Sequence, residues 1–442
     1  MRARTLIALF ITAVLTSIGA TPKPLAAGSK LNFLTQTTTT TPMLPGTTQP
    51  VSVAPGNQTN PHVACNLASY TFDDFEGSST IRYVDFATNT EHVLPVNGFD
   101  RLSETDGQRI AFTQLEADGD HINLYDIASQ TNTQVPGNRN FDPVIGGNLV
   151  AFVHAVSPDT GSAEIDAYDR NTGIVTPLTN DTSRNYFPSV SPDGNVIVWE
   201  KCQLDGKGCD IYSATQTGPG AFTTRQLTGA GEDHFPDTNG QIVAYVSDKS
   251  GENDIYFQRL GSATEMHLSI PGDQRDLSIS GNLIAFESGG VFPLNYDIFV
   301  YDLSSARLYQ VTNTTDVSET LTDLVAGCDG VNRIVYSKPG NFGDFDVWAF
   351  NFQLDDSIPD QLNDLVALVQ SFNLHDGTEA SLLTKLQDAL AAVNASNTAT
   401  ACDSLTAFIN ASQAQSGKKL TADQANQLVS SATQIKSDLG CQ

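Results

Sequence analysis

The stretch Gly194-Asn-Val-Ile-Val-Trp199 decides the fold, because the chain repeats a variant of it seven times. Each variant is a short apolar run closed by an aromatic residue, and the closing residues are Tyr70, Phe112, Phe152, Trp199, Tyr245, Phe286 and Tyr336. The steps between these residues are 42, 40, 47, 46, 41 and 50. Several short strands in a repeat of about 40–50 residues are typical of a β-propeller blade. The sequence therefore predicts an all-β propeller with seven blades.

The fourth repeat shows how one blade is written. An apolar segment starts at Phe187, Ser191-Pro-Asp-Gly194 is a tight turn, and Asn195–Glu200 is a second strand. The last repeat ends after its third strand, whereas Pro50–Gly56 resembles a fourth strand placed before the first repeat. We therefore expect the ring to close by pairing this N-terminal strand with the last blade, which removes a free sheet edge.

The two ends of the chain differ from the repeats. Residues 1–27 carry Arg2 and Arg4 before an apolar run and then small residues, which is typical of a secretory signal peptide. Residues 28–49 are rich in Thr and Pro and predict a linker. The propeller is expected over 50–355. In 356–442, apolar residues at helical spacing and a capping-box pattern at Thr421–Gln424 predict a small all-α bundle of four helices.

Export and charge limit the function classes. An exported chain would reside in the periplasm, on the cell surface or in the medium, and no second apolar stretch predicts a membrane span. The 23 basic and 50 acidic residues give a formal charge of −27. Such a surface argues against nucleic acid and anionic membranes as partners. The expected partner is a protein or a glycan, and the expected state is a monomer.

Six cysteines in an exported chain favour disulfides over metal thiolates. Cys202 and Cys209 flank one turn, while Cys65 and Cys328 lie in the first and last repeats, which are neighbours if the ring closes. Cys402 and Cys441 remain in the C-terminal segment. The pairs Cys65–Cys328, Cys202–Cys209 and Cys402–Cys441 are the hypothesis, out of about 15 possible pairings.

The motif Phe-Pro-x-x-Ser-Pro-Asp-Gly-Asn-x-Ile-x-Trp at 187–199, followed by Asp210-Ile-Tyr and Gln226-Leu-Thr, resembles the repeat of TolB-like (WD40-like, PD40-type) propellers. These repeats also resemble the propellers of prolyl-oligopeptidase-type peptidases. The run Ala407-Phe-Ile-Asn-Ala411 is similar to FIMAH-type helical modules of secreted bacterial proteins, which implies an accessory or attachment role. A propeller is a platform shared by many functions, so the resemblance implies a fold and no particular ligand.

Two sets of residues are candidates for a site at the mouth of the propeller channel. Basic side chains near the innermost strand of six repeats are His62, Arg101, Arg139, Arg184, His234 and Arg275. They predict either a cationic mouth for an anionic or sugar-like ligand, or pairs with acidic loops that hold the blades in register. Acidic loop residues that are candidate Ca²⁺ ligands are Asp118, Asp120, Asp248, Asp254, Asp344 and Asp346. No loop carries a complete Asp-x-Asp-x-Asp-Gly pattern.

Motifs for catalysis are missing from the sequence. It contains no Gly-x-Ser-x-Gly, no His-Glu-x-x-His and no phosphate-binding loop, and no catalytic residue is assigned. The interpretation is therefore a secreted, non-catalytic binding or interaction module that captures a ligand or protein at the channel mouth. The alternative is a metal-assisted polysaccharide lyase or hydrolase acting on an acidic glycan, as in some lyases that resemble TolB-like propellers. His62 and His234 would then lie near the metal.

Overall fold

The structure is a computed structural model that describes residues 32–35, 41–96, 98–157, 160–289, 295–315, 317–354, 357–372, 374 and 376–441. The expected signal peptide, residues 1–27, lies outside this range. No helix within the described residues has both the length and the apolar character needed to cross a membrane.

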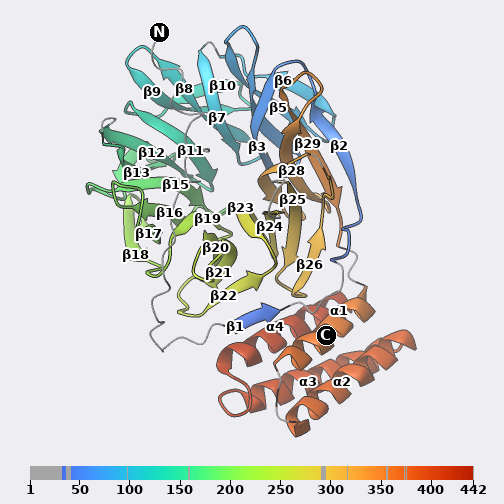
Figure 1. The fold of residues 1–442 in the computed structure, drawn as a ribbon. Helices are drawn as coiled ribbons and strands as arrows, with labels where there is room; N and C mark the ends of the chain where they lie inside the picture. The colour runs from blue at the N-terminus through green and yellow to red at the C-terminus, as the bar shows by residue number, and fades with distance from the viewer. Residues whose placement is uncertain are drawn as a thin grey trace. The chain divides into compact units, whose positions relative to one another are not determined.

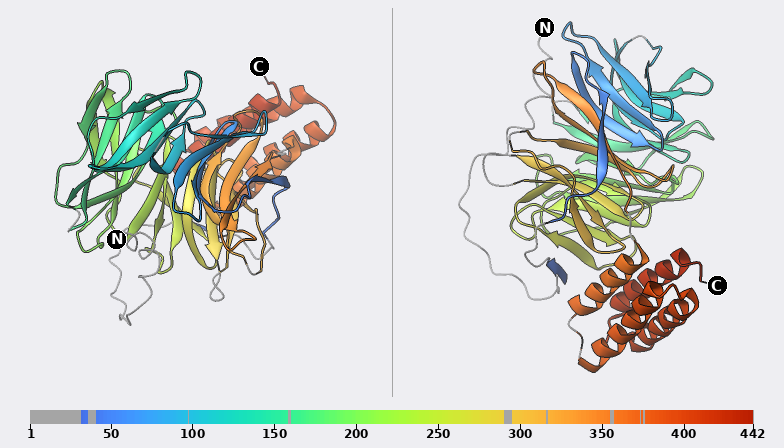
Figure 2. Two further views of the ribbon diagram at one scale, coloured as in Figure 1. Left: turned by 90° about the horizontal axis from the view of Figure 1, so that it is seen from above. Right: turned by 90° about the vertical axis from the view of Figure 1, so that its right-hand side faces the viewer.

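The strands between Asn57 and Phe352 are arranged in successive antiparallel sets around a common centre (Figures 1 and 2). The first strands of the sets are β3 (Asn57–Ala64), β7 (Phe99–Thr105), β11 (Asn140–Gly146), β15 (Arg184–Val190), β19 (Asp233–Thr238), β23 (Asp273–Ser280) and β27 (Thr320–Val325). Each first strand contacts the first strand of the next set, and β27 contacts β3. This circular order is the architecture of a β-propeller.

The outer strands of each set follow in chain order. The second strands are β4 (Leu67–Asp73), β8 (Arg109–Glu116), β12 (Leu149–Ser157), β16 (Val196–Cys202), β20 (Ile242–Ser247), β24 (Leu283–Gly289) and β28 (Asn332–Pro339). The third are β5 (Ser79–Asp85), β9 (Gly119–Asp126), β13 (Ser162–Asp169), β17 (Asp210–Gly218), β21 (Asp254–Arg259), β25 (Tyr296–Asp302) and β29 (Phe345–Phe352). The fourth are β6 (Thr90–Val93), β10 (Thr131–Gln134), β14 (Ile174–Pro177), β18 (Ala221–Gln226), β22 (Glu265–Ser269) and β26 (Arg307–Gln310).

The strands group into six sheets by hydrogen bonding. One sheet has eight strands because a single parallel pair, Ala163 with Arg184, joins the set β11–β14 to the set β15–β18. A five-stranded sheet contains β1 (Asn32–Thr35) beside β22, and the other four sheets have four strands each. The closing aromatics of the repeats lie on the second strands and are at most 3% exposed, so they form the packing between neighbouring sets.

The last set is completed by the N-terminal strand β2 (Gly46–Ser52), which pairs antiparallel with β29. β2 begins four residues before Pro50, inside the segment expected to be a linker, and Leu44 is buried against Phe350 and Phe352. A proline is compatible with this position because β2 is the outermost strand, and the register shifts between Pro50 and Ser52.

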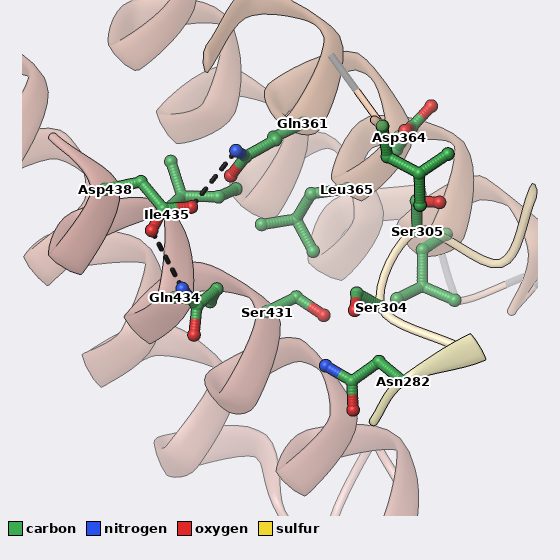
Figure 3. Close-up of a pocket in the computed structure, with 12 residues that line it drawn as sticks. Asn282, Ser304, Ser305, Gln361, Asp364, Leu365, Ser431, Gln434, Ile435 and Asp438 are labelled. Atoms are coloured by element: carbon green, nitrogen blue, oxygen red, sulfur yellow. Dashed lines mark hydrogen bonds between the residues drawn. The ribbon is translucent and has the colours of Figure 1, made fainter. Parts of the chain in front are cut away.

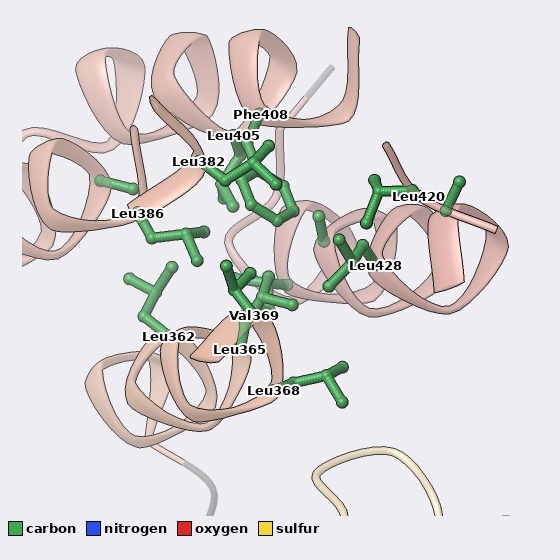
Figure 4. Packing of buried hydrophobic residues seen from close by; sticks show 14 residues of the cluster. Leu362, Leu365, Leu368, Val369, Leu382, Leu386, Leu405, Phe408, Leu420 and Leu428 are labelled. Carbon is green, nitrogen blue, oxygen red and sulfur yellow. The ribbon is translucent and has the colours of Figure 1, made fainter. Parts of the chain in front are cut away.

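Four helices follow the strands: α1 (Ile358–Ser371), α2 (Asp376–Asn394), α3 (Thr398–Gln415) and α4 (Ala422–Asp438). Thr421 and Gln424 form the capping box that begins α4. The helices share one hydrophobic core, in which Leu362, Leu386 and Phe408 are fully buried (Figure 4). They therefore bury their apolar faces against one another, as expected of a small bundle.

Three disulfides link the described cysteines. They join Cys65 to Cys328, Cys202 to Cys209 and Cys402 to Cys441, which are the three pairs hypothesised from the sequence. The first joins segments 263 residues apart and connects the first set of strands to the last. It therefore supports the same closure as the β2–β29 pairing.

Candidate functional site

Every first strand carries a β-bulge, and these bulges shape the channel side of the propeller. The register of each first strand against its second strand shifts by a residue or more, for example between Tyr186 and Ser189 and between His234 and Asp237. Residues at the bulges with left-handed backbones, at φ between 41° and 56°, are Asn60, Leu102, Asp142, Phe187, Phe235 and Asp276. A bulge re-aims the side chains on either side of it.

Two of these bulges present aromatic side chains. Phe187 is 41% exposed and Phe235 is 38% exposed, and their rings meet edge to face with centroids 4.8 Å apart. The contacts continue on both sides: Phe141 lies 6.3 Å from Tyr186, Tyr186 lies 6.2 Å from Phe187, and His234 lies 5.9 Å from Phe235. We call Phe141, Tyr186, Phe187, Phe235 and His234 the aromatic row. It crosses three successive first strands, β11, β15 and β19.

Two of the predicted mouth arginines are held by carboxylates. Arg101 donates both bonds of a bidentate pair from Nη2 to Asp120, at 3.0 and 2.9 Å. Arg275 donates from Nε to the fully buried Glu287 at 2.7 Å. The sequence had left two alternatives for the basic residues, a ligand site or pairs with acidic residues. These two arginines form pairs with acidic residues.

The two predicted histidines also contact carboxylates. His234 Nδ1 lies 3.2 Å from Glu200 Oε2, and His62 Nδ1 lies 3.7 Å from Asp323 Oδ2. Burial lowers the pKa of His234, but Glu200 and its neighbouring acids outweigh that effect and raise it. Burial likewise lowers the pKa of His62, whereas Asp323, Glu104 and other acids raise it to about 9. Both imidazoles therefore hold a proton more tightly than a free histidine does, and a metal ion would have to displace that proton.

Arg139 and Arg184 are different, because no described carboxylate lies within ion-pair distance of either. Arg139 is exposed, and its guanidinium is not bound in an ion pair by the described chain. The guanidinium carbon of Arg184 lies 5.5 Å from the centroid of the Tyr186 ring, so this cation sits over the aromatic row. A cation beside exposed aromatic rings is a combination suited to anionic or sugar-like groups.

The six basic residues do not occupy one equivalent position. Arg101, His234 and Arg275 directly precede the bulge of their strand, and Arg139 and Arg184 both lie two residues further back. His62 instead follows the bulge, at the position held by Glu104 in β7 and Asp237 in β19. At this position His62 is influenced by the charges of Glu104, Asp142 and Asp323.

The six candidate Ca²⁺ ligands lie in three separate sets of strands. Asp118 contacts His121 at 2.9 Å, and Glu116 lies close to both. Among the described residues, this is the only cluster of three possible metal ligands that includes a predicted Ca²⁺ ligand, Asp118. Asp120 is committed to Arg101, and Asp248 accepts from the Glu232 backbone N–H. Asp254 accepts from Ser250, while Asp344 and Asp346 lie together beside Gly340.

A second described group of possible metal ligands contains Glu200, Cys202, Cys209 and His234. Its two cysteines form a disulfide and have no thiolate to offer. Glu200 and His234 then remain as an ion pair, and Glu200 Oε2 also accepts the backbone N–H of Phe235 at 3.3 Å. This group therefore positions the aromatic row rather than a metal ion.

A separate hollow of about 340 Å³ is lined by polar residues of the propeller and of α1 and α4 (Figure 3). Asn282, Ser304 and Ser305 line one side, and Gln361 and Gln434 line the other. Gln361 and Gln434 both donate to Asp438, at 3.1 and 2.8 Å. Asp364 and Asp438 also line the hollow, and both are bound within the protein, because Asp364 pairs with Arg307 at 2.6 Å and Asp438 accepts from the two glutamines.

The sequence analysis did not single out the aromatic row. A signal for it exists in the repeats, because Phe187-Pro188 and Phe235-Pro236 place an aromatic residue before a proline at equivalent positions. The exposure of these rings depends on the left-handed backbone at φ 52° and 51°, which the sequence pattern does not reveal.

No family model matches the sequence, and no curated protein matches it. Solved structures do match. The β-propeller domain of the Trilobed protease from Pyrococcus furiosus has a TM-score of 0.52 at 13% identity, covering 67% of this chain and 96% of that one. An oligogalacturonate lyase from Vibrio parahaemolyticus has a TM-score of 0.51 at 10% identity, covering 69% and 93%.

An acylaminoacyl peptidase from Pyrococcus horikoshii has a TM-score of 0.52 at 14% identity, covering 68% of this chain. This chain spans about half of that peptidase, 52% of its length. At identities this low, the likeness concerns the fold and not the activity. The comparisons show that the strands of this chain form a β-propeller.

Proposed function

We propose that this chain is a secreted, non-catalytic binding module, in which a propeller of seven blades captures a ligand or a protein partner at its channel mouth. The proposal places the propeller over 50–355 and the helical module over 356–442, after a signal peptide and a linker. It includes a TolB-like repeat, a FIMAH-like attachment role for the helices and a monomeric state. Three disulfides are consistent with an oxidising, extracytoplasmic compartment.

The aromatic row is the observation that carries this proposal. Burying one phenylalanine side chain stabilises a fold by about 1.5–3 kcal/mol, yet Phe187 and Phe235 are both exposed by about two fifths. Both also hold a left-handed backbone, which bulky residues adopt at a cost of about 1–3 kcal/mol. A pair that is exposed and strained in this way contributes little to folding and is suited to contact with a partner.

The cations next to the row support a partner that carries negative charge. Arg184 lies over Tyr186, and neither Arg184 nor Arg139 has an ion-pair partner among the described residues. Arg101 and Arg275, in contrast, are neutralised by Asp120 and Glu287. The proposed ligand therefore offers a flat apolar face to the rings and an anionic group to Arg184 or Arg139.

The lyase or hydrolase alternative requires a metal bound by His62 or His234. Both histidines contact carboxylates, and their pKa values are raised, so binding a metal would first require loss of a proton. The geometry thus supports ligand capture more than metal-assisted catalysis.

Saturation-transfer NMR on the purified chain tests the proposal, with oligogalacturonate, a neutral oligosaccharide and an acidic peptide containing aromatic residues as probes. We expect saturable binding of an anionic probe that is lost in the double variant Phe187→Ala/Phe235→Ala. The matched control is Phe342→Ala/Phe345→Ala, which removes two exposed rings, 61% and 41% exposed, from the β28–β29 loop. Binding that survives the first pair of changes, or metal-dependent formation of unsaturated product from polygalacturonate, would contradict the proposal.

A further inference from the structure

Two buried carboxylates lie near each other where the loop after β28 enters β29, one at the end of the loop and one in the strand. Asp344 is 2% exposed and Asp346 is 5% exposed. Asp344 is well supplied with donors, because its Oδ1 accepts the Phe342 N–H at 3.2 Å and its Oδ2 accepts the Gly56 N–H at 3.1 Å. Asp346 is not: its Oδ1 is buried and has no hydrogen-bond partner among the described residues.

The open oxygen of Asp346 lies beside Gly340, near Oδ1 of Asp344. A methyl group placed on Gly340 would lie 2.8 Å from Asp346 Oδ1 and 2.5 Å from Asp344 Oδ1. Both oxygens therefore pack against Gly340 more closely than a residue with a Cβ would allow, and this brings them near each other. Gly340 is also fixed in position, because its N–H donates to the Asp344 carbonyl at 2.8 Å.

No described cation forms an ion pair with either carboxylate, and the charge of Lys338 acts on Asp346 only from a distance. Lys338 pairs with Asp346 in the β28–β29 register, but its Nζ lies 4.0 Å from the centroid of the Trp348 ring and not within ion-pair distance of either carboxylate. Burying a carboxylate without a partner is strongly unfavourable. Burial and the neighbouring charge of Asp344 accordingly raise the pKa of Asp346.

We propose that Asp344 and Asp346 together bind a calcium ion beside Gly340. Ca²⁺ prefers carboxylate and carbonyl oxygens, takes about 6–8 of them, and tolerates irregular geometry, so two carboxylates with backbone carbonyls and water form a suitable shell. The site is separate from the aromatic row, and its existence does not depend on the proposed binding function.

The position of the site gives the ion a role in closing the ring. Asp344 accepts the N–H of Gly56, which follows β2, the N-terminal strand that completes the last set. A cation that fixes the Asp344 carboxylate therefore fixes the contact between residues 288 apart in sequence. Calcium is expected to stabilise the folded chain by binding only this closed arrangement.

The test uses the full chain after removal of metals by a chelator, with CaCl₂ in titration calorimetry. We expect saturable binding to the unchanged chain and at least a tenfold weaker Kd in Gly340→Ala and in Asp346→Asn. Alanine is compatible with the backbone at Gly340, whose φ is not in the left-handed region, but its methyl would collide with Oδ1 of both carboxylates and move them from the positions in which they bind calcium. Gly218→Ala is the matched control, because Gly218 has no close neighbours and no left-handed φ, and it should bind Ca²⁺ normally.

A second measurement separates binding from misfolding. In chelator, Asp346→Asn should melt at the same temperature as the unchanged chain or higher, because it removes an uncompensated buried charge, but calcium should no longer raise its Tm. Terbium gives an independent readout, since Trp348 lies two residues from Asp346 on the same strand face and can sensitise its luminescence.

Trp199 is the other tryptophan of the chain, so Trp348→Phe should abolish the terbium signal and Trp199→Phe should retain it. The proposal is overturned if the unchanged chain shows no saturable Ca²⁺ binding. It is equally overturned if Gly340→Ala and Asp346→Asn each bind Ca²⁺ within threefold of the unchanged chain.

Discussion

The rings of Phe187 and Phe235 meet at 4.8 Å across two neighbouring first strands, and both residues hold left-handed backbones at φ 52° and 51°. The same bulge position carries Asn60, Asp142 and Asp276 in other sets of strands. Asparagine and aspartate tolerate this conformation better than phenylalanine does. Among the described first strands, Leu102, Phe187 and Phe235 are the bulky residues at this position, and the two phenylalanines build the exposed aromatic pair.

This relationship predicts that Phe187 is dispensable for folding. Phe187→Gly should leave the free energy of unfolding unchanged or raise it, because glycine adopts the left-handed region without strain, while Phe187→Ala should be less stable than Phe187→Gly by about 1 kcal/mol. Urea unfolding followed by circular dichroism measures both. Phe152→Ala is the control for a buried ring and should cost about 3–5 kcal/mol. A loss of that size in Phe187→Gly would show that the ring is part of the core.

The mouth arginines should separate into two classes. Arg101→Gln breaks the bidentate pair with Asp120 and should lower the free energy of unfolding by about 1 kcal/mol. Arg184→Gln removes no ion pair with a described residue and should change it by less than about 0.5 kcal/mol. Urea unfolding of the two variants in low salt provides the comparison. If both variants lost the same free energy of unfolding, Arg184 would also contribute to the stability of the fold.

Much of the propeller could be predicted from the sequence because its repeats are governed by burial. The closing aromatic of each repeat has to fill the space between neighbouring sets, so Tyr70 and Trp199 recur at matching places and both are buried. The N-terminal closure followed from an incomplete last repeat, although β2 starts at Gly46 rather than Pro50, since threonines extend an edge strand as well as the expected residues do.

The channel side was harder to predict, because a bulge changes which residues are equivalent. His62 and Arg101 look alike in a list of basic residues, yet one follows its bulge and the other precedes it. The ion pairs of the basic residues could not be predicted either. The sequence left open whether Arg101 faces a ligand or a carboxylate, and only the fold brings Asp120 to within 2.9 Å of it. The close approach of Asp344 and Asp346 to Gly340 depends on the geometry of the loop. From the sequence alone, these two residues were therefore only two of six acidic candidates.

The closure of the ring should depend on the disulfide between Cys65 and Cys328. Replacing both residues by serine should lower the free energy of unfolding by about 2–5 kcal/mol, because the bond restricts the unfolded chain over 263 residues of sequence. Calorimetry of the propeller transition measures the change. The control is Cys402→Ser/Cys441→Ser, which should affect the unfolding of the helices and leave the propeller transition in place. The prediction would be contradicted if the propeller transition had the same temperature and enthalpy in the unchanged chain and in both double-serine variants.

The channel around His62 should make stability depend on pH. Burial lowers the pKa of His62, but Asp323, Glu104 and Asp142 together raise it to about 9, against an ordinary value of 6.5. Burial also raises the pKa of Glu104 to about 8, although the charge of His62 opposes this. For both groups the folded chain holds its proton more tightly than the unfolded chain does.

The stabilisation is therefore complete below the unfolded pKa values and is lost as the pH rises through about 8 and 9. The free energy of unfolding should fall between pH 7 and pH 10, and His62→Gln should remove a share of this fall on the order of 2 kcal/mol. His92→Gln is the matched control, because His92 is exposed on β6 and stacks on Tyr83. Urea unfolding at a series of pH values tests the prediction, and a slope in His62→Gln equal to that of the unchanged chain would refute it.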